Sequence, residues 1–216
     1  DYSEAIRFHP KNAKYYTSRG LAYAKKRQTD KAIADFSEAI RLEPRTVEAY
    51  VSRGIARAAK GNREGAIEDH TKALELDPKY AKAYYNRAQV FGLMGQLERA
   101  LADYSKLIEI VSEDASAYCH RGVVYTRKKE LDMAVADFGK SIELDPEYSR
   151  PYYNRGLVRL IQGDAQKAVV DFTRAIELDP DYGIAYYNRG VAYQKMGEKT
   201  PAIRDFERAK SLGACR

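Results

Sequence analysis

The chain has 216 residues, of which 44% are hydrophobic and 31% are charged. This balance is ordinary for a folded protein and too apolar for an intrinsically disordered one. The longest stretch without a charged residue, 88–97, has ten residues, whereas a membrane-spanning helix needs about 20, so we expect none. The formal net charge of +6 favours anionic partners but is modest for a nucleic-acid binder.

The sequence repeats itself with a period of 34 residues. Prolines follow this interval at 10, 44, 78, 146 and 180, and Ser112 stands in the one missing place. Tyrosines follow it at 16, 50, 84, 118, 152 and 186, each with an arginine three residues later. Such a period is typical of stacked repeats. We therefore expect residues 1–12 to end a preceding repeat, and six repeats at 13–46, 47–80, 81–114, 115–148, 149–182 and 183–216.

Each repeat contains two helical patterns, at about positions 2–14 and 18–30 of its 34. A short turn, often with glycine, separates the patterns, and Asp-Pro or Glu-Pro usually ends the second. Small residues at positions 8, 20 and 27 let the helices approach closely, and aromatic residues at positions 4 and 24 fill the space beside them. A single repeat cannot bury its apolar face alone, so we expect one core that continues through stacked neighbours.

The repeat, with Y-x-x-R-G-x-x-Y, then A-x-x-x-F-x-x-A and a final proline, resembles the tetratricopeptide repeat over the whole chain. Tyrosine stands where the family's first aromatic residue is often tryptophan. The resemblance implies an all-α fold, a right-handed solenoid or superhelix of antiparallel helix pairs in a single array, with the first helices lining a concave groove. It also implies that the groove holds a peptide or helix of a partner protein.

The repeats are not equal. Arg57 and Arg159 replace the aromatic residue of position 11, and His70 replaces that of position 24. The third repeat has Ala88 and Leu107 at positions where smaller or more flexible residues are usual, and it lacks the closing proline. We therefore expect the connection around 109–116 to be the least regular, with a local change of curvature.

Arginine at position 7 and aspartate at position 23 occur in all six repeats. The turn within a repeat and the connection to the next repeat are each midway between such a pair. The sequence therefore allows ion pairs either within repeats or between them. In both cases a ladder that fixes the register of the helices is favoured over a row of ligand-binding arginines.

A second stripe runs along the first helix at positions 2, 5, 6, 9, 12 and 13, and the resemblance implies that it faces the groove. Asparagine at position 6 can bind a peptide backbone, tyrosine at position 5 adds flat apolar area, and cations at positions 2 and 13 favour an acidic partner. These cations are Lys14, Lys25, Lys82, Arg127, Arg150 and Lys195, against one acid, Glu48.

The stripe predicts a peptide-binding groove, best developed in the third, fifth and sixth repeats. The alternative is that its asparagines and tyrosines only solvate and pack a helix face. The predicted groove residues are Lys82, Tyr85, Asn86, Gln89, Arg127, Arg150, Tyr153, Asn154, Leu157, Tyr187, Asn188 and Val191.

No residue pattern indicates catalysis, a metal site or a cofactor. His9, His70 and His120 lie in different repeats, and Cys119 and His120 are adjacent in a helix, where side chains point to different parts of its face. The two cysteines, Cys119 and Cys215, form no CxxC pair, and no N-glycosylation sequon occurs, which fits a reducing compartment such as the cytoplasm. The clamp with which family members grip chaperone tails is incomplete, so we expect no binding of such tails.

The leading prediction is a protein–protein interaction scaffold without chemistry of its own. The chain could instead be a substrate-recruiting or regulatory segment of a larger enzyme or assembly, and binding of RNA or another polyanion is the least favoured reading. The sixth repeat ends without the polar helix that commonly caps such arrays, and 1–12 lacks its first helix. Exposed apolar ends tend to find partners, so self-association through the ends is expected.

Overall fold

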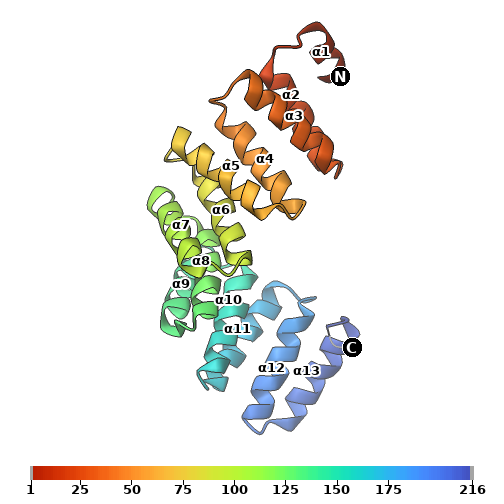
Figure 1. Cartoon of the computed structure of the whole chain (residues 1–216). Coiled ribbons are helices and arrows are strands. Elements are labelled where there is room, and N and C mark those ends of the chain that lie inside the picture. Colours follow the sequence, from red (N-terminus) through yellow and green to blue (C-terminus); the bar gives the residue numbers. More distant parts are fainter. Residues whose placement is uncertain (1, 215–216) are drawn as a thin grey trace. The chain divides into compact units, whose positions relative to one another are not determined.

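The computed structural model describes residues 2–214, which form thirteen α-helices and no β-strand (Figure 1). The chain divides into two compact units between Val111 and Ser112. The helices of the first unit are α1 (Tyr2–Phe8), α2 (Ala13–Lys25), α3 (Thr29–Leu42), α4 (Val47–Ala59), α5 (Arg63–Leu76), α6 (Ala81–Leu93) and α7 (Leu97–Ile110). Those of the second are α8 (Ala115–Lys128), α9 (Leu131–Leu144), α10 (Ser149–Ile161), α11 (Ala165–Leu178), α12 (Gly183–Lys195) and α13 (Lys199–Ser211). None of these helices is both long and apolar enough to cross a bilayer.

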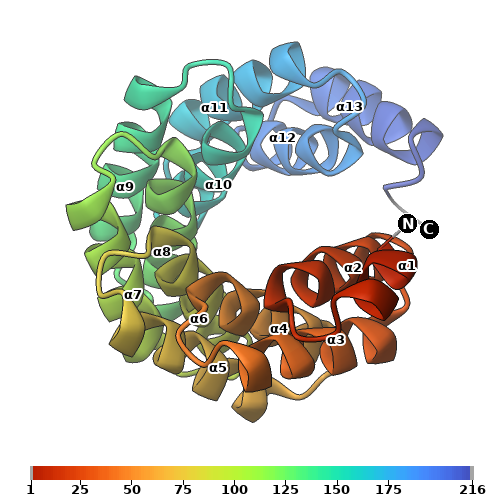
Figure 2. The same cartoon turned by 90° about the horizontal axis from the view of Figure 1, so that it is seen from above.

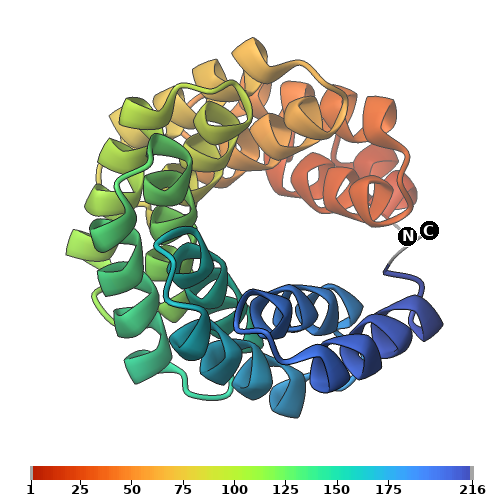
Figure 3. The same ribbon diagram turned by 90° about the horizontal axis from the view of Figure 1, so that it is seen from below.

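The helices follow the 34-residue register. First helices cover positions 1–13, with one extra residue in α8, and second helices cover positions 17–30, with one residue fewer in α13. In the first unit α2, α4 and α6 lie on the inner side and α3, α5 and α7 on the outer side; in the second unit α8, α10 and α12 are inner and α9, α11 and α13 outer (Figures 2 and 3). The predicted all-α solenoid of antiparallel helix pairs is confirmed. That the six repeats form a single array stays a prediction.

The turn inside each repeat requires a left-handed backbone at position 15. Glycine occupies this position in four repeats, with φ between 74° and 88°. Arg27 and Lys129 occupy it in the first and fourth repeats, with φ of 57° and 64°. Because a side chain in this conformation costs about 1 kcal/mol, these two turns are held by the helices on either side rather than by local preference.

The aromatic residue of position 24 packs against the small residue of position 8. Phe36, Phe138 and Phe172 are fully buried. A Cβ added to the facing glycine, such as Gly20, would lie 2.7 Å from the phenylalanine ring. The prediction that these glycines are steric requirements is therefore confirmed.

His70 breaks this pattern in the second repeat. It occupies the phenylalanine site against Gly54, it is completely buried, and neither ring nitrogen has a hydrogen-bond partner. Burial, and secondarily the charge of Arg87, lowers the pKa of His70 from 6.5 to about 4. The folded protein therefore holds a neutral imidazole whose two ring nitrogens have lost their hydrogen bonds to water and form none with the protein.

We predict that His70→Phe stabilises the protein by about 1 to 3 kcal/mol, because it removes two buried unpaired nitrogens. The unfolded chain takes up a proton near pH 6.5, whereas folded His70 does so only near pH 4. Acidification between these values therefore favours unfolding of the wild type through this group. The gain from His70→Phe should grow as the pH falls, and urea denaturation at several pH values measures it.

The converse substitution Phe138→His is the matched control, since it places an imidazole in the same register of the fourth repeat. It should lower stability and add the acid sensitivity that His70→Phe removes. Equal stability of His70→Phe and the wild type at every pH would contradict the account.

The arginine of position 7 pairs with the aspartate of position 23 in its own repeat, which settles the alternative that the sequence left open. In all six repeats the guanidinium Nε and Nη2 donate to both carboxylate oxygens, over 2.7 to 3.0 Å. The same guanidinium lies 5.5 to 5.8 Å from the centre of the position 4 tyrosine ring. The ion pair joins the two helices of each repeat, and the tyrosine, which lies on the same first helix as the arginine, packs against the guanidinium.

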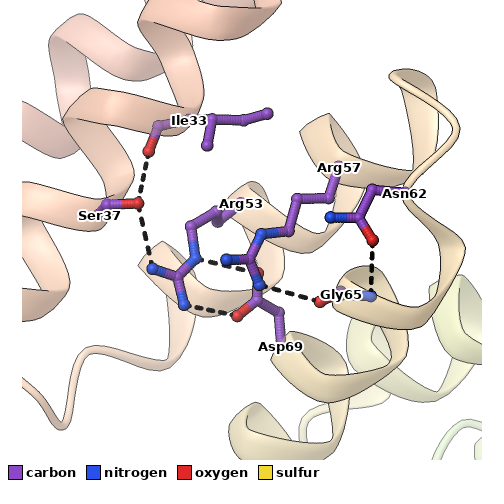
Figure 4. A network of polar contacts seen from close by, with 7 residues as sticks. All are labelled: Ile33, Ser37, Arg53, Arg57, Asn62, Gly65 and Asp69. Atoms are coloured by element: carbon purple, nitrogen blue, oxygen red, sulfur yellow. Dashed lines mark hydrogen bonds and ion pairs between the residues drawn. The ribbon is translucent and has the colours of Figure 1, made fainter.

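The arginine also reaches the preceding repeat. Arg53 Nη1 donates to Ser37 Oγ over 3.1 Å, and Ser37 Oγ donates to the Ile33 carbonyl (Figure 4). Arg57, which replaces the aromatic residue of position 11, forms a second ion pair with Asp69, with Nη1 3.0 Å from Oδ2. Arg19, Arg87 and Arg189 bind a serine or threonine of the preceding repeat in the same way. One side chain thus connects neighbouring repeats as well as the helices of its own.

Arg155 lacks this connection because Gly139 stands where the repeats that precede the other five arginines carry Ser3, Ser37, Thr71, Ser105 and Thr173. A Cβ added to Gly139 would meet only Arg155 Nη1, at 3.9 Å. We predict that Gly139→Ser stabilises the second unit by about 1 to 2 kcal/mol, through helix propensity and a new hydrogen bond from Arg155. Thermal or urea denaturation measures the gain.

Gly139→Ala is the control, because alanine supplies the helix propensity without the hydroxyl group. Serine is the poorer helix former by about 0.5 kcal/mol. A larger gain for Gly139→Ser than for Gly139→Ala therefore reports the hydrogen bond, and the opposite order would contradict the role given to the hydroxyl row.

The connection predicted to be least regular joins α7 to α8. It spans 111–114, the same length as the other connections between repeats, and Asp114 caps α8 by accepting from the Ala117 N–H over 3.0 Å. The division between the two compact units falls inside it. The change of curvature expected there stays a prediction.

Candidate functional site

The inner helices of each unit carry the residues predicted to form a groove. Lys82, Tyr85, Asn86 and Gln89 lie on α6 of the first unit. The other eight lie on α8, α10 and α12 of the second unit, namely Arg127, Arg150, Tyr153, Asn154, Leu157, Tyr187, Asn188 and Val191. All twelve are at least partly exposed. Each unit therefore presents its own set, while their action as one binding surface stays a prediction.

The stripe is less uniform than the sequence predicted. At position 5, Val51 and Cys119 are buried, with 1% and 3% of their surface exposed, whereas Tyr187 is 39% exposed. A small residue at this position sinks between neighbouring helices, whereas a tyrosine is too long to do so. Position 5 thus belongs to the core in the second and fourth repeats and to the surface in the sixth.

The asparagines of position 6 also bind their own chain. Asn188 Nδ2 donates to the Tyr153 hydroxyl over 3.1 Å and to the Ile184 carbonyl over 3.0 Å. Asn154 Nδ2 lies 3.8 Å from Cys119 Sγ, and Asn86 Nδ2 donates to the Lys82 carbonyl. Two of the three asparagines thus contact position 5 of the preceding repeat, which sequence reasoning missed although the constant spacing of 35 residues could have revealed it.

These bonds orient the amide groups. Among the described residues no donor reaches the Oδ1 atoms of Asn86, Asn154 and Asn188, so each presents a hydrogen-bond acceptor on a partly exposed side chain. The arrangement suits the N–H groups of an extended polypeptide.

Tyr153 of α10 and Tyr187 of α12 pack against other aromatic rings of the second unit. The Tyr153 ring lies 4.8 Å from that of Tyr182 and 5.9 Å from that of Phe172, centre to centre, and Tyr187 lies 5.5 Å from Phe206. Burial raises the pKa of the Tyr153 hydroxyl despite the bond from Asn188. The rings are held in place by these contacts, so they form a rigid surface that loses little entropy on binding.

The inner face of the first unit contains a pocket of about 200 Å³, which the sequence did not predict. Its apolar lining comes from α2, α3 and α4, and comprises Leu21, Ala24, Phe36, Ile55, Ala56 and Ala59. Thr29 and Ser52 add hydroxyl groups, and Lys82 of α6 is the one charged residue of this lining. Leu21 and Ile55 are 46% and 38% exposed, although both are large and apolar.

The signal for this pocket was present in the sequence. Leu21 and Ile55 both occupy position 9 of the stripe, and alanine occupies position 12 of the first repeat and position 13 of the second. In the fifth repeat Leu160 stands where the first has Ala24, and it packs against the core around Phe172. Small residues beside two apolar side chains leave the space open in the first unit.

The cations of the stripe are exposed. Lys14, Lys25, Lys82, Arg150 and Lys195 all belong to this class, and none of the four lysines has a carboxylate within ion-pair distance in the described chain. Lysines without carboxylate neighbours give the inner faces an excess of positive charge. Exposed cations of this kind speed the approach of an acidic partner.

Cys119 and His120, whose side-chain types often act in catalysis, are held in structural contacts here. Burial raises the pKa of the Cys119 thiol, which disfavours the reactive thiolate. His120 Nδ1 lies 2.7 Å from the Ser116 carbonyl of its own helix. Within 2–214, no three His, Cys, Asp or Glu side chains come together as metal ligands. Cys215 lies outside the described residues.

Family models match the chain over most of its length. The model described as tetratricopeptide repeat matches residues 13–45, 115–148 and 183–212, and the model described as TPR repeat matches 56–95, 93–129 and 159–197. Because the second model alone covers more than half of the chain, the match identifies the repeat unit and not an isolated helix pair. No curated protein sequence matches the chain.

Several solved structures have a similar fold. MamA from Desulfovibrio magneticus RS-1 is 25% identical, with a TM-score of 0.73 over 79% of this chain and 96% of that one. YrrB, described as a TPR protein with an unusual peptide-binding site, is 23% identical, with a TM-score of 0.70 over 85% and 95%. A tetratricopeptide repeat protein from Parabacteroides merdae is 23% identical, with a TM-score of 0.80 over 93% and 79%.

Proposed function

The chain belongs to the tetratricopeptide-repeat family, and on that premise we propose that it is a protein-interaction scaffold that binds an extended segment of a partner polypeptide on its inner helices. The observation that carries the proposal is that Asn86 in the first unit, and Asn154 and Asn188 in the second, are partly exposed, with their amide nitrogens bound to their own chain and their oxygens open. The scaffold acts by binding and needs no reacting group of its own.

Three kinds of side chain contribute to binding of the partner polypeptide. Asparagine oxygens accept from backbone N–H groups, which every peptide sequence supplies. The rigid rings of Tyr153 and Tyr187 provide apolar contact area. The exposed cations, including Lys82 and Arg150, add long-range attraction for acidic residues, so the partner segment is acidic.

We predict that a library of random dodecapeptides displayed on phage yields binders to the full chain. The triple variant Asn86→Ala, Asn154→Ala, Asn188→Ala should bind them about tenfold more weakly, because it removes acceptors of backbone hydrogen bonds. Binding should also weaken as salt is raised, since salt screens exposed charges. Fluorescence anisotropy with the isolated peptides measures both effects.

Gln166→Ala is the matched control, because it removes an exposed amide from α11, on the outer side of the second unit. It should leave the affinities unchanged. A library that yields no binders, or binders with equal affinity for the wild type and the asparagine variant, would overturn the proposal.

Self-association is proposed as a second kind of protein contact. Tyr2 and Phe8 of α1 are large apolar side chains with 46% and 65% of their surface exposed. We predict that light scattering of the 216-residue chain shows oligomers at high concentration, and that Tyr2→Glu with Phe8→Glu shifts them to monomer. A wild type that stays monomeric at high concentration would refute this prediction.

A further inference from the structure

The pocket on α2, α3 and α4, with Lys82 of α6 in its lining, contains none of the position 6 asparagines, so their role in backbone binding does not explain it. Its volume of about 200 Å³ is below the roughly 300–1,000 Å³ of sites that enclose a whole small molecule. It is, however, of the size of one large side chain. The pocket therefore fits a part of a longer ligand whose remainder lies outside it.

We propose that this pocket is a specificity subsite that takes one large aliphatic or aromatic side chain of a bound polypeptide, next to an acidic residue that pairs with Lys82. The inference rests on the proposed function, and it adds which residue types the first unit selects. It concerns the first unit alone, where all the lining residues lie.

The chemistry of the lining carries the choice of occupant. The lining includes Phe36, fully buried, and Ala56, 5% exposed, so a side chain that enters the pocket loses water from the surface that it turns toward them. Leu21 and Ile55 stand at the rim as exposed apolar residues, which an incoming apolar side chain would cover. Burial of such a group is the main source of affinity at peptide-binding sites.

Charge decides which polypeptide fits. Lys82 is exposed, lies in the lining and has no carboxylate partner in the described chain. The lining contains no acidic residue. A carboxylate beside the buried side chain would therefore find a cation there, whereas a lysine or arginine at the same place would be repelled.

Ala24 and Ala59 allow a direct test, because both are exposed, so a larger side chain fills the pocket without disturbing the core. The probe is the set of dodecapeptides selected on the wild-type chain. Binders of the first unit should combine Leu, Ile, Met or Phe with a neighbouring Asp or Glu. They should bind the variant Ala24→Leu, Ala59→Leu about tenfold or more weakly.

Ala34→Leu is the matched control, since Ala34 is exposed on α3 and outside the pocket lining. It adds the same side chain and should leave affinity unchanged. Lys82→Met keeps the aliphatic length and removes the charge, so it should weaken binding about two- to fivefold and reduce its salt dependence. Lys199→Met, an exposed lysine of α13, controls for the change in net charge.

The outcomes separate the subsite from the general function. If every peptide binds the filled-pocket variant as well as the wild type but loses affinity for the asparagine variant, the subsite is refuted and the scaffold function stands. If no peptide binds the wild type, both fail. If the wild type dimerises and Ala24→Leu, Ala59→Leu abolishes the dimer, the occupant is a second copy and the proposal is overturned.

Discussion

A single arginine in each repeat joins its first helix to the second helix of the same repeat and, as at Arg53, to the preceding repeat. It binds the aspartate of the second helix through two hydrogen bonds, and its guanidinium lies over the tyrosine at position 4 of the same helix. Arg19, Arg53, Arg87 and Arg189 also donate to a hydroxyl group of the preceding repeat. Loss of one partner from a buried pair of this kind costs about 3 to 5 kcal/mol. The aspartates are 1% to 6% exposed, whereas the arginine side chains are 15% to 23% exposed, so it is the carboxylate that loses its partner in a buried place.

This fixed geometry gives the inner face its chemistry. Within a unit, each repeat contributes positions 2, 6, 9 and 13 of its first helix to the inner side, so a change of one side chain changes one place on the surface. Alanine at 24 and 59 opens a pocket, and Leu160 fills the equivalent place in the fifth repeat. A constant framework with a few variable surface positions is how a repeat protein can acquire a particular partner.

Most of the fold could be predicted from the 34-residue period. The helix bounds follow from the register to within one residue, and the steric role of Gly20 follows from the phenylalanine that faces it. The depth of individual side chains could not be predicted. Val51 and Cys119 share a register with exposed Tyr187 but are buried, since burial depends on side-chain length against the neighbouring helix. Nor could the sequence choose the partner of Arg53, because Asp35 of the preceding repeat lies 18 residues before it and Asp69 of its own repeat lies 16 residues after it. The packing of the helices decides in favour of Asp69.

The account depends on the inner helices being the surface that holds the partner. Hydrogen exchange of the backbone amides, measured with and without a bound dodecapeptide, tests this most directly, because ligand contact suppresses the local openings that allow exchange. Slower exchange confined to first helices, such as α4, α6, α10 and α12, is the predicted result. Slower exchange in α5, α7, α11 and α13, with the first helices unchanged, would place the ligand on the outer side and contradict the account.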